Sequence, residues 1–461
     1  MVAMLLFTSL AHVAFMPLPH GGAMRALSRA SETHERMPRV HVRMDAARSR
    51  IPMAATMAPS AGDVKGRVLV VGSINVDLYQ RLEGGQAKFS GTPLSIAPIK
   101  GMTLPAASFV GTPAVKADVE SAGLVCTSGE EEGFVLTMDG PFTQKTGGKG
   151  ANAASAAGQT YACEFIGNMG AQSESENKAL LADLKAFGNV DVARSATLPH
   201  TPTGTAYILL FDDNDNAIVL LGGANQKWPD AEALRTGEEG AKLRAAIEGS
   251  VCVMLQREVP EYVNVVTAEL ARAARKPVFM DVGGTDAPLD EALIPLISVI
   301  APNESELTFI SGVETKVGGK LDGKAIRTAV AALKAKFAKR GNERVEVLVT
   351  LGGLGSCHFG KLWCPHGTMT PEASAHETRV GCFALGTAGG KPMDTCGAGD
   401  CFRGSYVGAR YGEGRGVLEA MTWAAAAGSL SVEVEGAMPS MPSRQQIAQR
   451  AKEKMLPLPE L

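Results

Sequence analysis

The most informative stretch of this 461-residue chain is DTCGAGDCFRGSYVGAR, residues 394–410. It begins with a tight turn of small residues, Gly397, Ala398 and Gly399. A helix-like run follows, with apolar side chains at Phe402, Tyr406 and Val407. A helix that begins at glycines exposes free backbone N–H groups and the positive end of the helix dipole. Such a helix start can bind a phosphate and stabilise the charge that develops when a phosphoryl group moves.

One carboxylate stands beside this turn. Asp400 follows Gly399 directly and is placed to accept a proton from an attacking hydroxyl group. The alternative for the same residues is a glycine-rich turn in which Asp400 only caps the helix.

Short apolar runs upstream predict strands that are buried on both faces of a sheet. They are Arg67–Val71, Val251–Leu255, Val278–Met280, Ser298–Ala301 and Val345–Thr350. Helix-like stretches lie between them, at Asp230–Ile247, Val263–Arg275 and Lys324–Lys339. Strands that alternate with helices predict an α/β fold with a doubly wound, mainly parallel sheet flanked by helices.

Two segments interrupt this alternation. Ala206–Phe211 and Ala217–Leu221 flank the polar turn Asp212–Asn216, which predicts a β-hairpin. The segment Arg81–Lys145 is rich in Gly, Pro, Ser and Thr, and we expect it to be partly strand and partly an inserted, mobile segment. A small second β-sheet is therefore predicted beside the main one.

Composition restricts the function classes. Hydrophobic residues make up 45% of the chain and the net charge is −3, so a large core is possible and a general attraction to nucleic acid or anionic membrane is not supported. No apolar run reaches the ~18 residues of a membrane span. The 8 cysteines contain no C-x-x-C pair, which predicts free thiols in a reducing compartment.

The first 65 residues have the composition of a targeting leader. Residues 1–15 are apolar and uncharged, and residues 25–50 contain seven Arg, no Lys and three acids. This order resembles the two-part leader of proteins sent to complex plastids. We therefore expect residues 1–65 to be a disordered leader to an organelle, most plausibly a plastid, and residues 66–455 to fold. A tail without an address, on a cytoplasmic protein, is the alternative.

Two further glycine motifs accompany the 394–410 stretch. VGSINVD, residues 71–77, follows the first predicted strand, and GGKGAN, residues 147–152, opens an Ala-rich helical run. Neither is a G-x-G-x-x-G dinucleotide motif, and the second lacks the form of a P-loop. A nicotinamide-dependent enzyme and a P-loop ATPase are therefore disfavoured.

With these motifs in this order, the chain resembles the PfkB carbohydrate-kinase family, and within it the ribokinases, from about residue 68 to 444. The shared motifs are G-S-x-N-x-D, G-G-K-G-x-N, a lid hairpin, N-x-x-E, T-L-G and D-T-x-G-A-G-D. The chain departs from the family in a long extra segment between Asp77 and Gly147. The resemblance implies a ribokinase-like fold whose β-sheet lid is built from segments near 75–146 and 203–225.

The resemblance also implies roles for individual residues. The sugar would be bound by Asn75, Asp77, Gly148, Lys149, Asn152 and Glu258, and Asp400 would be the base beside the Gly397–Gly399 anion hole. Taken by itself, Lys149 could equally be a surface charge. An Asp–Asn pair offers both acceptors and donors to sugar hydroxyls, and glycines allow close approach of the backbone.

ATP and its ions are assigned in the same way. The nucleotide would lie against Asn303, Thr350, Gly352 and Gly355, and Glu306 would act on Mg²⁺ through water. Asn303 and Glu306 also have the spacing of a helix capping box, and both readings can hold together. A K⁺ activator would be held mostly by backbone oxygens of Asp394, Cys396, Ser431, Val434, Gly436 and Ser440.

The expected reaction is in-line phosphoryl transfer from Mg·ATP to O5 of ribose. The alternatives are another sugar or a nucleoside as substrate, or a non-catalytic plastid scaffold. The expected partners are a small sugar and ATP, with no nucleic acid and no membrane, and a homodimer through the lid is possible.

Overall fold

The computed structural model describes residues 66–81, 88–89, 92–93, 103–105, 143–171, 174–188, 190–210, 216–285, 287–361 and 376–458. All of them belong to one compact unit, Ala55–Leu461. The predicted leader and most of residues 82–142 lie outside the described part.

A nine-stranded sheet forms the centre of the described fold, in the order β20-β19-β18-β15-β14-β13-β1-β7-β9. The strands from β9 to β18 pair in parallel, and β19 and β20 continue the sheet antiparallel. Their bounds are β1 Arg67–Val71, β7 Cys163–Ile166, β9 Val190–Asp191, β13 Ser250–Leu255, β14 Val278–Asp281, β15 Val299–Ala301, β18 Glu346–Thr350, β19 Ser356–Phe359 and β20 Glu377–Val380. The five predicted strands are confirmed to within a residue or two.

Alternate residues of β1 enter two different hydrophobic cores. Val68 and Val70 belong to the core on one face of the sheet, and Leu69 and Val71 belong to the core on the other. Successive side chains of a strand point to opposite faces, so a continuous apolar run is what a strand covered on both faces requires.

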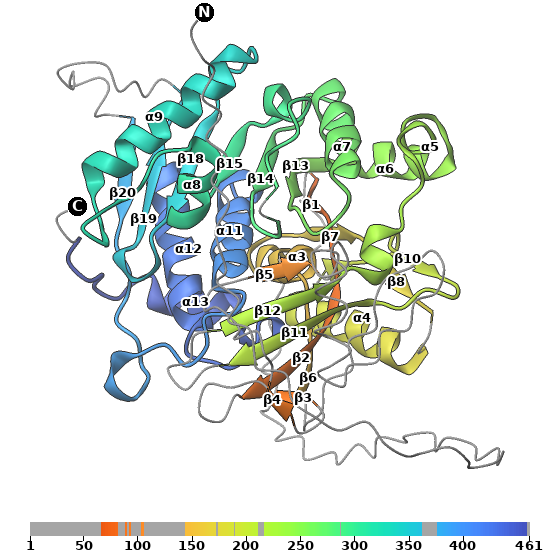
Figure 1. The fold of residues 1–461 in the computed structure, drawn as a ribbon, viewed down its shortest axis with the longest axis horizontal. Helices are drawn as coiled ribbons and strands as arrows, with labels where there is room; N and C mark the ends of the chain where they lie inside the picture. Colours follow the sequence, from red (N-terminus) through yellow and green to blue (C-terminus); the bar gives the residue numbers. More distant parts are fainter. Residues whose placement is uncertain are drawn as a thin grey trace, which may run out of the picture. The chain divides into compact units, whose positions relative to one another are not determined.

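Helices cover both faces (Figure 1). One layer contains α3 Lys149–Thr160, α4 Glu174–Gly188, α11 Ala398–Val407, α12 Val417–Ser431 and α13 Arg444–Arg450. The other contains α5 Ala231–Thr236, α6 Glu238–Glu248, α7 Glu261–Ala273, α8 Glu304–Ser311 and α9 Gly323–Lys339. The doubly wound α/β fold predicted from the sequence is therefore confirmed.

One predicted helix is wrong in its extent. The stretch Asp230–Ile247 forms two helices, α5 and α6, which meet at Gly237. Gly237 has an extended backbone and ends α5. The apolar residues before and after it therefore lie on two separate helices with different axes.

The second sheet has five strands in the order β5-β12-β11-β2-β6. Their bounds are β2 Asn75–Arg81, β5 Thr103–Pro105, β6 Thr143–Gly147, β11 Gly204–Leu210 and β12 Asn216–Leu221. The antiparallel pairing of β11 with β12 confirms the predicted hairpin, although residues 211–215 of its turn lie outside the described part. The prediction that Arg81–Lys145 is partly strand agrees with β5 and β6, while its inserted part is not described.

Short elements complete the described part. The small strands are β3 Lys88–Phe89, β4 Thr92–Pro93, β8 Asn168–Gly170, β10 Ala196–Leu198, β16 Lys316–Val317 and β17 Lys320–Leu321. Short helical turns are η2 Gly223–Gln226, η3 Ile294–Leu296, η4 Gly352–Leu354, η5 Ala388–Gly390, η6 Gly408–Gly412 and η7 Met438–Ser440. The cysteines in this part are free thiols, as predicted, and none of its helices is long and apolar enough to cross a membrane.

Candidate active site

Five neighbouring strands of the main sheet deliver polar side chains to the same edge. Ser73 follows β1, Glu258 follows β13, Asp281 ends β14, Asn303 follows β15 and Thr350 ends β18. The carboxyl ends of adjacent parallel strands meet at one edge of a sheet, which is where ligands bind in open α/β folds. The structure thus gathers residues that lie far apart in the sequence.

Helix α11 points its start at this edge. Its N-cap is Gly397, which has φ 74 and no side-chain cap. The Ala398 N–H donates to Thr395 O at 3.2 Å, which leaves the N–H groups of Gly397 and Gly399 without an acceptor among the described residues. Asp400 lies inside the first turn of α11 and does not cap it, so the helix-cap alternative is wrong. The helix start therefore offers donors and a positive dipole end to an anion.

Two donors hold the buried carboxylate of Asp400. Lys149 Nζ donates to Oδ1 at 2.9 Å, and Asn152 Nδ2 donates to Oδ2 at 3.0 Å. Both donors come from α3, which packs alongside α11 (Figure 1). This contact brings GGKGAN and GAGD together, so Lys149 is not the free surface charge that remained open from the sequence.

The ion pairs continue beyond Lys149. Lys149 Nζ lies 3.2 Å from Asp281 Oδ2, and Arg403 Nη1 lies 3.2 Å from the same oxygen. Arg403 Nη2 then contacts Glu306 Oε2 at 3.1 Å. Five side chains of alternating sign, Asp400, Lys149, Asp281, Arg403 and Glu306, form a chain of charges, which we call the charge chain. It runs from the base candidate to the predicted Mg²⁺ residue.

The charge chain sets the protonation of its members. Burial disfavours the charge on Lys149, but Asp281 and Asp400 outweigh it and hold the pKa of Lys149 above its usual range. Burial would likewise raise the pKa of Asp281, yet Arg403 and Lys149 hold it below its usual value. Burial raises the pKa of Glu306, against the opposing charge of Arg403. Lys149 and Asp281 are thus held as a charged pair.

Two buried oxygens near Asp400 have no hydrogen-bond partner. They are Oδ1 of Asp77 and Oδ1 of Asn152, and both lack a donor among the described residues. Asp77 is 3% exposed, and burial, reinforced by the negative charges of Glu258, Asp400 and Asp394, raises its pKa well above the usual range. Buried polar atoms normally find partners, so these two acceptors fit a ligand that carries hydroxyl donors.

The other predicted sugar residues lie around this point. Asn75 Oδ1 accepts a bond of 2.7 Å from Asn225 Nδ2. Glu258 Oε2 accepts a bond of 2.6 Å from Ser73 Oγ and one of 3.0 Å from Lys149 N. Burial raises the pKa of Glu258. The side chains that would face a sugar are thus oriented by hydrogen bonds to neighbouring residues.

The start of α3 depends on glycine. Gly148 is the N-cap of α3 with φ 92, and a Cβ there would lie 2.8 Å from Asn75 N. A side chain at this position would be strained by its backbone conformation and would also push β2 away from α3. Gly148 therefore allows β2 and the start of α3, which carry predicted sugar-binding residues, to lie in contact.

The predicted nucleotide residues occupy the neighbouring strand ends. Asn303 and Glu306 form the predicted capping box of α8, with Glu306 N donating to Asn303 Oδ1 at 2.8 Å. Thr350 pairs with Asn303 through a parallel β-bridge. Beyond Thr350, Gly352 has φ 54 with open space where a Cβ would point, and Gly355 has φ 95. A tight turn with open space beside it is able to receive a flat or extended ligand.

The donor set suits Mg²⁺ only through water. Among the described residues, no group of three or more His, Cys, Asp or Glu side chains could hold a metal ion. Glu306 already accepts from Asn303 N at 2.7 Å and from Arg403 on one oxygen. A single carboxylate beside a phosphate site fits an ion that keeps several of its waters.

Asp394 binds two of the other predicted K⁺ residues, Cys396 and Gly436, through their backbone N–H groups. The buried carboxylate of Asp394 accepts from Cys396 N at 2.9 Å and from Gly436 N at 2.8 Å, which fixes two loops against each other. The hydroxyls of Ser431 and Ser440 donate to Gly428 O and Ala437 O, and Val434 is 44% exposed. The Asp394–Cys396–Gly436 group offers a buried negative charge and nearby carbonyls, which fits a hard cation.

Three site residues escaped the sequence analysis. Asp281 ends a strand at the ligand edge, just as Glu258 follows one, so its position was a usable signal. Arg403 is a charge between the apolar Phe402 and Tyr406 on the buried face of α11. Asn225 lies in a turn of unremarkable composition, and only the tertiary structure brings it to Asn75.

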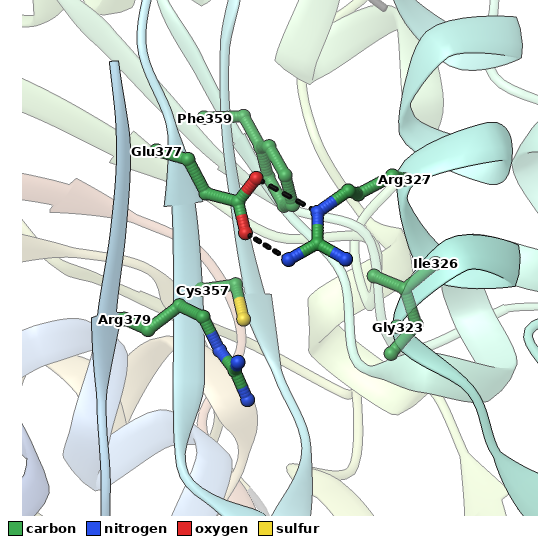
Figure 2. Close-up of a pocket in the computed structure, with 7 residues that line it drawn as sticks. All are labelled: Gly323, Ile326, Arg327, Cys357, Phe359, Glu377 and Arg379. Carbon is green, nitrogen blue, oxygen red and sulfur yellow. Dashed lines mark hydrogen bonds and ion pairs between the residues drawn. The ribbon is translucent and has the colours of Figure 1, made fainter. Parts of the chain in front are cut away.

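A small pocket elsewhere is separate from this site (Figure 2). It lies between α9 and the β19–β20 edge of the main sheet, and its residues are Gly323, Ile326, Arg327, Cys357, Phe359, Glu377 and Arg379. Arg327 binds Glu377 there with both Nε and Nη2, at 2.9 and 2.8 Å. None of these residues belongs to the charge chain.

Comparisons with known proteins give the family and the fold that this chain resembles. The sequence profile of the pfkB family carbohydrate kinases matches residues 135–444. A ribokinase of Arabidopsis thaliana is 34% identical over 66% of this chain and 72% of its own length. A ribokinase of Bacillus subtilis is 29% identical over 71% of this chain and 95% of its own length. The solved structure of Arabidopsis thaliana ribokinase complexed with ribose and ATP superposes with a TM-score of 0.59 at 27% identity, covering 85% of this chain and 100% of that one.

Proposed function

Because this chain belongs to the pfkB family of carbohydrate kinases, we propose that it transfers the γ-phosphoryl group of ATP to O5 of D-ribose. The family and the ribokinase relatives identify it as an ATP-dependent carbohydrate kinase. Ribose, the position of transfer and the roles of the residues below are our proposal.

The observation that carries the proposal is the pair of unpartnered acceptors beside Asp400. Asp77 Oδ1 and Asn152 Oδ1 are buried, and Asn152 also donates to Asp400. A sugar hydroxyl donates to one acceptor and accepts from another group, so a polyol satisfies such a site where an apolar ligand does not. The solved relative complexed with ribose and ATP supports ribose as that polyol.

Asp400 removes the proton from the attacking hydroxyl in this proposal. Lys149 Nζ, 2.9 Å from Asp400 Oδ1, and Asn152 hold this carboxylate in a fixed orientation beside the start of α11. The N–H groups at the start of α11 stabilise the negative charge on the transferred phosphoryl group. The second sheet, with its β11–β12 hairpin, closes over the sugar and excludes water that would otherwise hydrolyse ATP.

ATP lies along the strand ends that carry Asn303, Thr350, Gly352 and Gly355. Glu306 would hold Mg²⁺ through water, and the ion would supply charge neutralisation for the phosphates. A K⁺ ion at the Asp394–Cys396–Gly436 group would order the loop that precedes α11.

A coupled assay of ADP release tests the substrate. We expect purified protein with Mg·ATP and K⁺ to turn over ribose faster than fructose, adenosine or ketodeoxygluconate. Mass spectrometry of the product should show ribose 5-phosphate. Faster turnover of another acceptor would support kinase activity but show that ribose is not the preferred substrate. No turnover with any acceptor would favour a non-catalytic scaffold.

Two properties of the whole protein belong to the same proposal. The edge strands of the second sheet, β5 and β6, are where two copies would pair to form a homodimer through the lid. The leader at residues 1–65 directs the kinase to an organelle, the plastid, because of its apolar start and its Arg-rich, acid-poor continuation.

A further inference from the structure

Arg403 is a buried cation that the proposed reaction does not yet use. It lies on α11, three residues after Asp400, and is 2% exposed. Its Nη1 would lie 2.9 Å from a Cβ on Gly399, so the guanidinium lies directly against the glycine turn. A buried cation at this place needs a physical reason, because removing a charge from water is costly unless it is paired.

Asp281 is shared between two cations. Its Oδ2 lies 3.2 Å from Arg403 Nη1 and 3.2 Å from Lys149 Nζ. Lys149 in turn lies 2.9 Å from Asp400 Oδ1. Two carboxylates, Asp281 and Asp400, therefore compete for one lysine, and Arg403 neutralises one of the competitors.

We propose that Arg403 is a positioning residue for the catalytic base: by pairing with Asp281, it leaves the Lys149 ammonium to Asp400. This inference rests on the proposed function, in which Asp400 takes the proton of the sugar hydroxyl. Arg403 acts through Lys149 and does not itself touch the sugar.

The balance of charge supports this role. The charge chain holds three acids and two bases. Without Arg403 one lysine would serve three carboxylates, of which Asp281 and Asp400 are buried and Glu306 is half-buried, and the interaction of unit charges at such distances is strong in a partly desolvated site. Asp281 is the most buried of the three at 1% exposure, so its unpaired charge would be costly and would draw Lys149 from Asp400.

Other titratable groups lie near Asp400 and Arg403, but none of them could replace Arg403 as the cation that pairs with Asp281. The groups that face Asp400 are Lys149 of α3, Glu258 after β13, Asp77 of β2 and, on its own helix, Cys401 and Arg403. Arg403 also faces Glu306 of α8 and Asp281 of β14. All but Lys149, Arg403 and the Cys401 thiol are acids. No other cation in this set could take over the pairing with Asp281.

The test is the pH dependence of kcat in Arg403→Gln. We expect the acidic limb of the profile to move to higher pH by about one unit or more, so that kcat measured at a pH below the limb falls ~10-fold relative to the wild type, because protons then compete for a base that has lost its ammonium partner. The double variant Arg403→Gln with Asp281→Asn should return the limb toward its wild-type position, since the competing carboxylate is gone. A purely structural role predicts no such rescue.

Three further variants keep the proposal testable if Arg403→Gln does not fold. Arg403→Lys keeps the charge and should keep the limb in place. Asp281→Asn alone should move the limb to lower pH, because Lys149 then belongs to Asp400 only. The matched control Arg327→Gln breaks an Arg–Glu pair in the pocket of Figure 2 and should lower the melting temperature without moving the limb.

A crystal structure of Arg403→Gln gives a readout that does not depend on turnover. We expect Lys149 Nζ to bind Asp281 and to leave Asp400. An unmoved acidic limb in Asp281→Asn, or a Lys149 that stays on Asp400 in Arg403→Gln, would overturn the inference. A wild type that turns over no acceptor would overturn the proposed function instead, and the crystal structure would still decide whether Arg403 controls Lys149.

Discussion

Asp400, the proposed base, is a buried carboxylate. Both of its oxygens are taken, one by an ammonium and one by an amide. The two donors fix the orientation of the carboxylate, and in the proposed reaction it accepts a proton when the sugar hydroxyl replaces one of them. The orientation of the Asp400 carboxylate therefore depends on Lys149 and Asn152 of α3.

Asp400→Asn removes this acceptor while keeping size and polarity. We expect kcat to fall ~10²- to 10⁴-fold, while the Kd for ribose, measured by calorimetry, changes only a few-fold. Asp230→Asn, at the exposed N-cap of α5, is the matched control and should leave both unchanged, because Asn caps helices as well as Asp does. Near-normal turnover in Asp400→Asn would show that another group is the base.

The buried carboxyl of Asp77 should favour sugar binding and, at high pH, lower the stability of the folded protein. Its pKa is raised in the folded protein by burial and by neighbouring carboxylates. The folded state therefore holds this proton more tightly than the unfolded state, and the corresponding stability is complete at pH values below the unfolded pKa. It is lost as pH rises through the folded pKa.

Asp77→Asn should accordingly raise the melting temperature at pH 8 and change it much less near pH 4. The same variant should weaken ribose binding ~10-fold or more, because the amide NH₂ replaces one of the carboxyl oxygens that can accept from a sugar hydroxyl. Calorimetric unfolding at the two pH values checks the first effect, and titration with ribose checks the second. A variant that is less stable than the wild type at pH 8 would contradict the sign of this effect.

Helix α11 depends on one backbone conformation at its start. Gly397 has φ 74, and a Cβ there would lie 2.8 Å from Ala437 Cβ. The glycine lets the chain turn into the helix while the loop containing Ala437 packs against it. The turn, the helix and the following loop form one unit around the proposed anion hole.

Gly397→Ala should therefore lower both stability and kcat. The backbone conformation alone costs ~1–2 kcal/mol for a residue with a Cβ, and displacement of the turn moves the N–H groups. Gly414→Ala is a matched control, because Gly414 has φ 73 but no atom within 4 Å of a Cβ. We expect both variants to lose stability in thermal unfolding, Gly397→Ala by more because its Cβ would also clash with Ala437, and we expect a loss of kcat only in Gly397→Ala.

Elements were predictable where the local pattern and the burial agree. β1 and β13 are continuous apolar runs, and they lie where the sequence placed them. The α5–α6 break was missed, because one glycine inside a periodic stretch does not show whether the helix bends or ends. Gly237 adopts an extended backbone in the folded protein, and the local sequence pattern does not predict this conformation.

At the scale of the whole molecule, the sequence predicts a targeting leader ahead of the kinase fold. A fluorescent protein fused to residues 1–64 should accumulate in an organelle, because the apolar start and the Arg-rich continuation form an import signal. Microscopy with a plastid marker checks the address. A fusion of residues 25–64, which lacks the apolar start, should miss it, and a diffuse cytosolic signal from residues 1–64 would contradict the prediction.

Motifs in the sequence were sufficient to determine the family, the α/β fold and most of the candidate site, because glycine turns and strand-end carboxylates leave local traces. The roles of Asp281, Arg403 and Asn225 were decided only by the tertiary structure. Ion pairs and amide bonds between distant segments depend on which strand ends and helices meet. The sequence does not distinguish a buried arginine from an exposed one, because its partners come within about 3 Å only in the folded protein.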